Sequence, residues 1–285
     1  MQLALGTVQF GLAYGIAGRD SAVSAPEARA ILARAHALGV RSLDTAAAYG
    51  DIESRLADLC GDLDFAITTK LAPRPRDVTL SELPGWTLAQ LEQSLSRLGP
   101  RLRQVLVHRA DDLLEPGGDA IWTALADWGA AHGVHIGVSA YAPAALAPLQ
   151  SRPGFAITQL PGNAIDQRIA RAWPTAPGFE VQLRSAFLQG LLLMREDDAV
   201  RRVPAAAAPL ASWHAWCRER DLDPLAAALS VVKSFAAVDT CVVGVDRLEQ
   251  LEQIAAAWQR VGAVAAPQLH CDHNAVIDPR QWSAT

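Results

Sequence analysis

Short apolar runs alternate with longer stretches of helical periodicity along the whole chain. Most of the runs are almost continuously apolar, which is typical of strands buried on both faces of a parallel sheet. Eight such units share 285 residues, or about 36 residues per unit. This repeat predicts one (β/α)8 TIM barrel, a single domain over residues 1–285, because right-handed crossovers join parallel strands in that way. The strand candidates are residues 3–8, 41–45, 65–70, 103–108, 134–139, 155–160, 179–185 and 240–245.

Capping residues mark the expected helices between these runs. The first begins with Ser24 as N-cap and Glu27 three residues later, and it ends at Gly39. Segments 87–99, 119–133 and 247–262 also end in glycine, and two more helical segments lie between residues 205 and 237.

A doubly wound sheet is the alternative fold. A sheet of that type ordinarily carries a GxGxxG turn after its first strand. The segment "GTVQFGLAYGIAG" that follows the first run has several glycines but lacks this spacing, and no GxxxxGK[ST] motif occurs. The barrel is therefore preferred.

Composition excludes several classes of function. The net charge is −5, and no basic run is longer than Arg201-Arg202, so no nucleic-acid-binding patch is expected. No uncharged apolar stretch reaches 18 residues, and the N-terminus lacks the pattern of a signal peptide. Four cysteines are scattered without CxxC spacing, which predicts reduced thiols in a cytoplasmic protein. No coiled-coil heptads indicate a larger assembly, so we expect a monomer or a small homo-oligomer.

Three successive strand candidates end in ionisable residues. Asp44, Lys70 and His108 occupy these ends, and Tyr49 follows Asp44 in the next loop. Each residue alone has a structural explanation: a turn-capping carboxylate, a solvated lysine, a hydrogen-bonded core histidine, a half-buried tyrosine. Together they predict a reactive site, because a barrel directs the C-terminal ends of its strands into one mouth.

The segments around these residues resemble the signature of the aldo-keto reductase superfamily. They are "LDTAAAYG" followed by a glutamate, "TTK" and "VLVHRADD", and the likeness continues through "GVS", "QLPGN", "RSAFLQGLL" and "GVDRLEQLEQ" over nearly the whole chain. The resemblance implies a (β/α)8 enzyme that binds a nicotinamide cofactor without a Rossmann domain. It also implies hydride transfer between that cofactor and a carbonyl or alcohol substrate.

The resemblance further implies a catalytic tetrad of Asp44, Tyr49, Lys70 and His108. Tyr49 is the expected general acid, although a free phenol has a pKa near 10 and donates poorly at neutral pH. Lys70 is expected to favour the phenolate and Asp44 to keep Lys70 charged. His108 is expected to donate an N–H to the carbonyl oxygen. A catalytically weak barrel that binds NAD(P)H as a redox sensor is the rival function.

The residues implied for cofactor binding lie at the ends of several strands. They are Gly6, Thr7, Asp44, Ser139, Gln159, Arg184, Ser185, Phe187, Gln189, Gly190, Gly244, Val245, Asp246, Arg247 and Gln250.

Two of these residues depart from the family pattern. Arg184 stands where an aromatic residue often stacks on the nicotinamide, and its guanidinium could stack there or bind a pyrophosphate or an acidic substrate. Asp246 stands where relatives often bind a 2′-phosphate, and it suits ribose hydroxyls instead. The family pattern and Arg247 favour NADP(H), with NAD(H) as the alternative.

Substrate-binding residues are less well defined by sequence. Tyr14, Trp86 and Arg109 are the candidates, with Trp86 expected in the loop after the third strand. In some relatives a long C-terminal loop closes the pocket over bulky substrates. The segment after Gly262 is short, so the resemblance favours a small aldehyde or sugar as substrate. The "HCDH" stretch at 270–273 contains metal-ligand residue types, but adjacent ligands rarely reach one ion, so an exposed tail without metal is expected.

Overall fold

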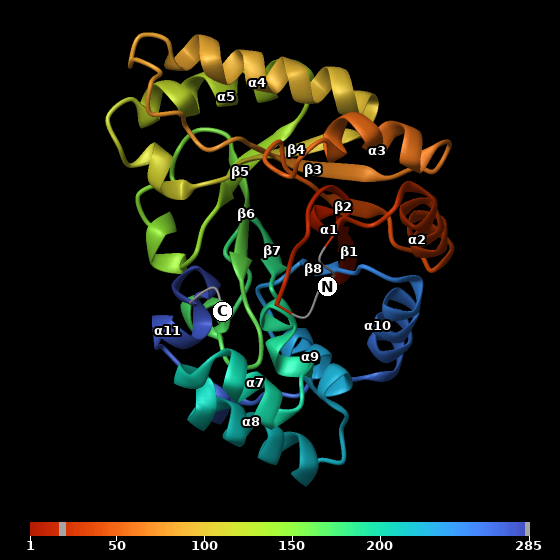
Figure 1. The fold of residues 1–285 in the computed structure, drawn as a ribbon. Coiled ribbons are helices and arrows are strands. Elements are labelled where there is room, and N and C mark those ends of the chain that lie inside the picture. The colour runs from red at the N-terminus through yellow and green to blue at the C-terminus, as the bar shows by residue number, and fades with distance from the viewer. Residues whose placement is uncertain (17–20, 283–285) are drawn as a thin grey trace.

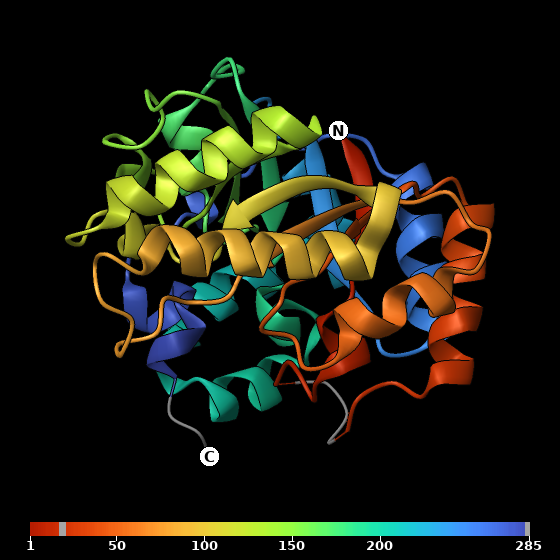
Figure 2. The ribbon, with the colours of Figure 1, turned by 90° about the horizontal axis from the view of Figure 1, so that it is seen from above.

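The computed structural model describes residues 1–16 and 21–282, and it confirms the (β/α)8 barrel (Figures 1 and 2). Eight parallel strands pair in sequence order, and β1 closes the barrel against β8, with Gly6 opposite Gly244. The strands are β1 (Gln2–Gly6), β2 (Ser42–Asp44), β3 (Ala66–Leu71), β4 (Leu102–Val107), β5 (His135–Ser139), β6 (Phe155–Pro161), β7 (Glu180–Arg184) and β8 (Thr240–Gly244).

Helices surround the strands (Figure 1), and α4 lies beside α5 along the outside of the barrel (Figure 2). The α-helices are α1 (Val8–Gly11), α2 (Ala25–Ala37), α3 (Ile52–Cys60), α4 (Leu83–Leu98), α5 (Gly118–His132), α6 (Arg168–Ala172), α7 (Glu196–Arg202), α8 (Ala207–Glu219), α9 (Pro224–Lys233), α10 (Leu248–Arg260) and α11 (Asn274–Ile277). The 3-10 helices are η1 (Gly99–Arg101), η2 (Ala110–Leu113), η3 (Pro143–Leu146), η4 (Leu188–Leu193), η5 (Pro204–Ala206), η6 (Pro267–Leu269) and η7 (Pro279–Gln281).

The capping residues act as their positions predict. The Ser24 side chain accepts a hydrogen bond from the Glu27 amide at the start of α2. After the same helix, Gly39 adopts a φ of +88°, a conformation that side chains disfavour. Within the described ranges, no helix combines the length and the apolar character needed to cross a bilayer.

Two expectations about local structure are wrong. Helix α4 begins at Leu83 rather than near residue 87, so Trp86 lies in its first turn and not in a loop. Pro84 explains this early start, because proline is accommodated at the beginning of a helix. The 270–273 segment is also only partly exposed, because Cys271 is buried and its amide donates to the carbonyl of Ile165.

Polar side chains form a hydrogen-bonded network inside the barrel, which the apolar strand pattern did not predict. The Gln182 amide donates to Gln104 Oε1 at 2.8 Å and to Glu180 Oε1 at 3.1 Å. Gln104 in turn donates to Glu180 Oε2 at 2.7 Å and accepts from the Thr68 hydroxyl at 2.5 Å. Each amide therefore has defined partners, as buried polar groups require.

Close packing between β5 and β6 requires a glycine at position 137. A Cβ placed on Gly137 would overlap the carbonyl oxygen of Ile157 on the neighbouring strand. Because backbone atoms cannot move aside cheaply, we expect Gly137→Ala to lower the free energy of unfolding by about 3 kcal/mol in urea denaturation. Gly85→Ala in α4 is the matched control, since that position is open. It should change stability by less than about 1 kcal/mol, and equal effects of the two variants would contradict this packing argument.

Candidate active site

A buried ion pair lies at the C-terminal ends of β2 and β3. Lys70 is 1% exposed, and its Nζ lies 2.7 Å from Asp44 Oδ1, 2.8 Å from Asp44 Oδ2 and 2.9 Å from the Thr45 carbonyl oxygen. Burial alone lowers the pKa of Lys70, but the Asp44 carboxylate outweighs it, and the pKa is raised. Lys70 is therefore a charged ammonium group with an acceptor for each proton.

Tyr49 and His108 lie beside this pair. Lys70 Nζ is 5.2 Å from the centroid of the Tyr49 ring. The rings of Tyr49 and His108 are 5.9 Å apart and nearly perpendicular, at 83°. The structure thus brings together the four residues expected to form the tetrad, from three strands and one loop.

Two glycines hold the loop that carries Tyr49. A Cβ on Gly11 would overlap the Tyr49 carbonyl oxygen, so α1 can approach this loop only with glycine at that position. Gly50 has a φ of +67°, and a Cβ there would lie 2.9 Å from the Gly11 carbonyl oxygen. The backbone that positions the phenol therefore depends on contact with α1, which the sequence pattern did not reveal.

His108 is a neutral imidazole. Burial, reinforced by the positive charges of Lys70, Arg184 and Arg109, lowers the pKa of His108 to about 3. Its Nδ1 is buried and has no hydrogen-bond partner among the described residues. At neutral pH the ring can donate one N–H to an incoming oxygen while carrying no charge.

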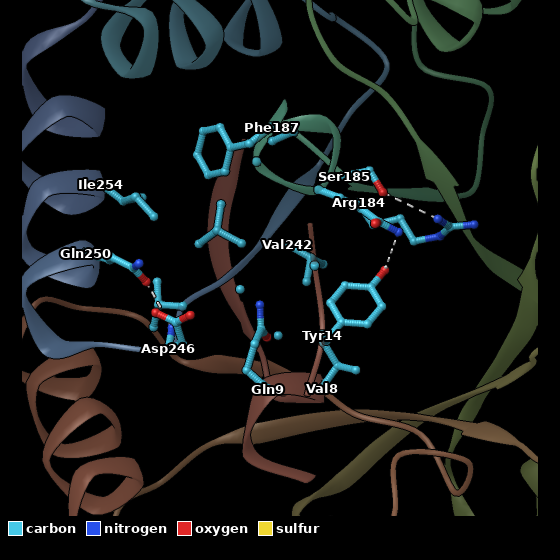
Figure 3. A pocket seen from close by; sticks show the side chains of 18 of the residues that line it. Val8, Gln9, Tyr14, Arg184, Ser185, Phe187, Val242, Asp246, Gln250 and Ile254 are labelled. Carbon is cyan, nitrogen blue, oxygen red and sulfur yellow. Dashed lines mark hydrogen bonds between the residues drawn. The ribbon is translucent and has the colours of Figure 1, made fainter. Parts of the chain in front are cut away.

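A cavity of about 400 Å³ opens beside Tyr49 and extends toward α10 (Figure 3). Most of the residues expected to bind cofactor or to react line it: Gly6, Asp44, Tyr49, Arg184, Ser185, Phe187, Gln189, Gly190, Gly244, Val245, Asp246 and Gln250. Other lining residues were not anticipated: Val8, Gln9, Gly15, Ala186, Leu193, Met194, Leu225, Val242, Val243 and Ile254.

Several expected site residues lie outside the cavity wall. Thr7, Ser139 and Gln159 are buried at strand ends, and Gln159 Nε2 donates to Asp44 Oδ1 at 2.6 Å. The Arg247 side chain is 60% exposed and does not line the cavity.

Of the three residues expected to bind substrate, one lines the cavity and two do not. Tyr14 lines the cavity, and its hydroxyl accepts from Gln189 Nε2 at 3.5 Å. Trp86 and Arg109 do not line it, and Arg109 Nε lies 3.7 Å from Asp112. Among the described residues, no three His, Cys, Asp or Glu side chains are grouped so that they could hold a metal ion.

Backbone conformation shapes the wall of the cavity. A Cβ on Gly244 would collide with the Gln9 amide, so the Gln9 side chain can occupy its place against β8 only with glycine at position 244 and would otherwise have to move aside. In the loop after β7, Ser185, Leu188 and Gln189 adopt φ values of 63°, 49° and 54°. Such left-handed conformations are uncommon outside glycine and cluster at active sites and ligand-binding segments of proteins.

Buried oxygen atoms without hydrogen-bond partners suit a ligand that donates hydrogen bonds from hydroxyl and amide groups. Gln9 Oε1, Asp246 Oδ1 and Gln159 Oε1 are buried without a hydrogen-bond partner among the described residues. Gln9 and Asp246 line the cavity, and Asp246 is only 7% exposed (Figure 3). Buried acceptors without partners are costly, so a bound ligand with donors would stabilise them. Ribose hydroxyls of a nicotinamide cofactor meet this requirement.

Comparison with known proteins gives a consistent family assignment. The aldo/keto reductase family model matches residues 2–262. An aldo-keto reductase of Bacillus halodurans, AKR11C1, is 17% identical with a TM-score of 0.70, covering 98% of this chain and 95% of that one. The glycerol dehydrogenase AKR11B4 of Gluconobacter oxydans is 19% identical with a TM-score of 0.67, covering 92% and 87%. At these identities the two structures show the shared fold. No curated protein matches the chain.

The neutral state of His108 has a consequence for stability. Below its ordinary pKa of about 6.5 the unfolded chain binds a proton here that the folded chain does not bind until about pH 3. Stability therefore decreases as the pH falls through this window. The free energy of unfolding of the wild type should fall between pH 7 and pH 4. We expect this fall to be smaller by roughly 2–3 kcal/mol in His108→Asn, which lacks the titrating imidazole.

Urea denaturation at a series of pH values measures this effect. His273→Asn is the control, because that residue is exposed near the C-terminus and should leave the slope unchanged. An unchanged slope in His108→Asn would mean that His108 is not held neutral in the folded protein.

Proposed function

The chain belongs to the aldo/keto reductase family, and we propose that it reduces a small aldehyde or ketone to the alcohol, or catalyses the reverse reaction, with a nicotinamide cofactor. The observation that carries this proposal is the grouping of Tyr49, His108 and the Lys70–Asp44 pair beside the cavity, with Tyr49 and Asp44 in its wall and Lys70 and His108 behind them. A proton donor, a neutral hydrogen-bond donor and a fixed positive charge together suit the protonation of a carbonyl oxygen.

Tyr49 is the proposed general acid. The phenol lies at the cavity wall, where the carbonyl oxygen of a substrate can approach it. The bound nicotinamide would supply the hydride. As negative charge develops on the oxygen, the Tyr49 hydroxyl donates its proton, and the nearby ammonium of Lys70 favours the phenolate that remains.

His108 is the proposed orienting group. Because its imidazole is neutral, it can donate an N–H to the carbonyl oxygen without competing with Tyr49 as an acid. Only one ring nitrogen carries a hydrogen in this state. The oxygen would thus accept two hydrogen bonds, one from His108 and one from Tyr49.

For the cofactor, the placement of Asp246 supports NAD(H) over NADP(H). A buried carboxylate with an unpartnered oxygen repels a 2′-phosphate and accepts from a ribose hydroxyl. Arg247, the cation that favoured NADP(H) from sequence, is exposed and lies 4.0 Å from Asp246 Oδ1 at its nearest atom. The carboxylate lines the cavity proposed for the cofactor, whereas the cation does not.

Burial of the cysteines supports a cytoplasmic location. Cys60, Cys217, Cys241 and Cys271 are all free and buried. Burial raises the pKa of Cys60 to about 11 and that of Cys241 to about 12, so both remain protonated thiols. Free, unpaired thiols are typical of proteins kept in a reducing compartment.

We predict that Tyr49→Phe lowers kcat with small aldehydes at least 100-fold, because the variant lacks the proton donor. The measurement is the loss of NADH absorbance. Fluorescence titration of the same variant with NADH is the control, and its Kd should stay within about threefold of the wild type, since the ring is retained. Full turnover in Tyr49→Phe would remove Tyr49 from the acid role, and tight cofactor binding by a wild type without any turnover would favour the redox-sensing alternative.

We predict that the wild type binds NADH more tightly than NADPH by at least 10-fold in fluorescence titration. Asp246→Ser should reduce that ratio by roughly 10-fold or more, because it removes both the repulsion of the phosphate and an acceptor for the hydroxyl. Arg247→Gln is the control and should leave the NADH affinity within about twofold. Tighter binding of NADPH by the wild type would overturn the assignment of Asp246.

A further inference from the structure

Arg184 is a cation at the edge of the cavity, and no carboxylate of residues 1–16 or 21–282 forms an ion pair with it. It ends β7 and lines the cavity. Its Nη2 donates to the Ala140 carbonyl oxygen at 3.3 Å and its Nη1 to the Ser185 hydroxyl at 3.4 Å. Both acceptors are neutral, and the guanidinium also lies 4.6 Å from the centroid of the Tyr141 ring.

The neighbouring cations differ from Arg184 in one respect. Lys70 is paired with Asp44 at 2.7 Å, and Arg109 lies 3.7 Å from Asp112. Arg280 packs on the same Tyr141 ring, but its Nε and Nη2 donate to the Asp278 carboxylate at 2.9 and 2.6 Å. Among these four cations of the site, only Arg184 has a charge that no carboxylate of the described residues offsets.

We infer that the natural substrate carries an anionic group, and that Arg184 binds this group and so determines substrate specificity. The inference rests on the function proposed above. The substrate class is a small aldehyde or ketone that bears a carboxylate, or a phosphate, a few bonds from its carbonyl.

The position of Arg184 relative to the catalytic residues supports this assignment. Its charge contributes, after burial and Lys70, to the lowered pKa of His108, and it also acts on Tyr14. Arg184 also lines the same cavity as Tyr49, one of the two residues that would hold the carbonyl oxygen. An anion bound to Arg184 would lie beside a carbonyl held by Tyr49 and His108.

The chemistry of the guanidinium favours a planar anion. A partly buried charge without a partner is destabilising, and a carboxylate from the substrate would offset it. The arginine fork forms two parallel hydrogen bonds to a carboxylate or phosphate. The contacts with Ala140 and Tyr141 hold the side chain in place, so little conformational entropy is lost when the anion binds.

The test compares matched substrates that differ in one anionic group. We would measure kcat/KM for 4-oxobutanoate against butanal, and for glyceraldehyde 3-phosphate against glyceraldehyde, in the wild type and in Arg184→Gln. The wild type should prefer at least one anionic member by 10-fold or more. Arg184→Gln should lower kcat/KM for that member by roughly 10- to 100-fold, mainly through KM, and should lower kcat/KM for the neutral counterpart by a factor at least about fivefold smaller. The pair that shows the effect distinguishes carboxylate from phosphate.

Two further variants serve as comparisons. Arg184→Lys should recover part of the preference, because it restores the charge without the fork. Arg201→Gln should leave the preference intact, because it removes a distant surface charge that is paired with Asp198 on α7.

A binding measurement makes the test independent of turnover. Succinate and inorganic phosphate are titrated by calorimetry into the protein–NADH complex, and Arg184→Gln should weaken the binding of the preferred anion at least 10-fold.

Equal kcat/KM values within both wild-type pairs, together with no anion binding, would overturn the inference. It would also be overturned if Arg184→Gln weakened NADH binding 10-fold and affected charged and neutral substrates equally, since Arg184 would then be a cofactor ligand. Failure of the wild type to bind either nicotinamide cofactor would instead overturn the proposed function.

Discussion

The buried ion pair between Lys70 and Asp44 is the interaction on which the rest of the site depends. Two charges removed from water are stable only when hydrogen bonds satisfy their remaining donors and acceptors. Thr45 supplies one acceptor through its carbonyl oxygen, and Gln159 supplies one donor, 2.6 Å from Asp44 Oδ1. The pair in turn fixes a positive charge 5.2 Å from the centroid of the Tyr49 ring.

Inside the barrel, a chain of side-chain hydrogen bonds continues from the Lys70–Asp44 pair away from the mouth. Gln159 Nε2 also lies 3.1 Å from Gln182 Oε1, and the Gln182 amide donates onward to Gln104 and Glu180. Carboxylates accept hydrogen bonds at both ends of this chain, Asp44 at one and Glu180 at the other, so the orientation of each amide between them is determined. A network of this kind holds the Asp44 carboxylate in one position, where an apolar interior would leave it without hydrogen-bond donors.

Local patterns predicted the barrel and the ionisable residues at its strand ends, and the resemblance to the aldo-keto reductase superfamily implied the tetrad. Continuous apolar runs mark the strands, and ionisable residues such as Lys70 and His108 interrupt the pattern where strands end. The contacts that the sequence did not reveal connect distant segments. Gly11 touches the Tyr49 loop 38 residues later, and Gln9 packs against Gly244 across the closure of the barrel. The side chain of Arg184 was expected near the cofactor, but its direction depends on Tyr141 and Ala140, which no local pattern specifies.

The most direct test of the account is the rate of hydride transfer in the double variant Asp44→Asn/Lys70→Met, measured by stopped-flow loss of NADH absorbance after mixing with an aldehyde. Replacing both partners avoids a buried unpaired charge, so the fold and NADH binding should be retained. The account predicts a rate at least 100-fold below that of the wild type at saturating cofactor. A rate equal to that of the wild type, in a folded variant that binds NADH, would contradict the claim that this ion pair sustains proton transfer from Tyr49.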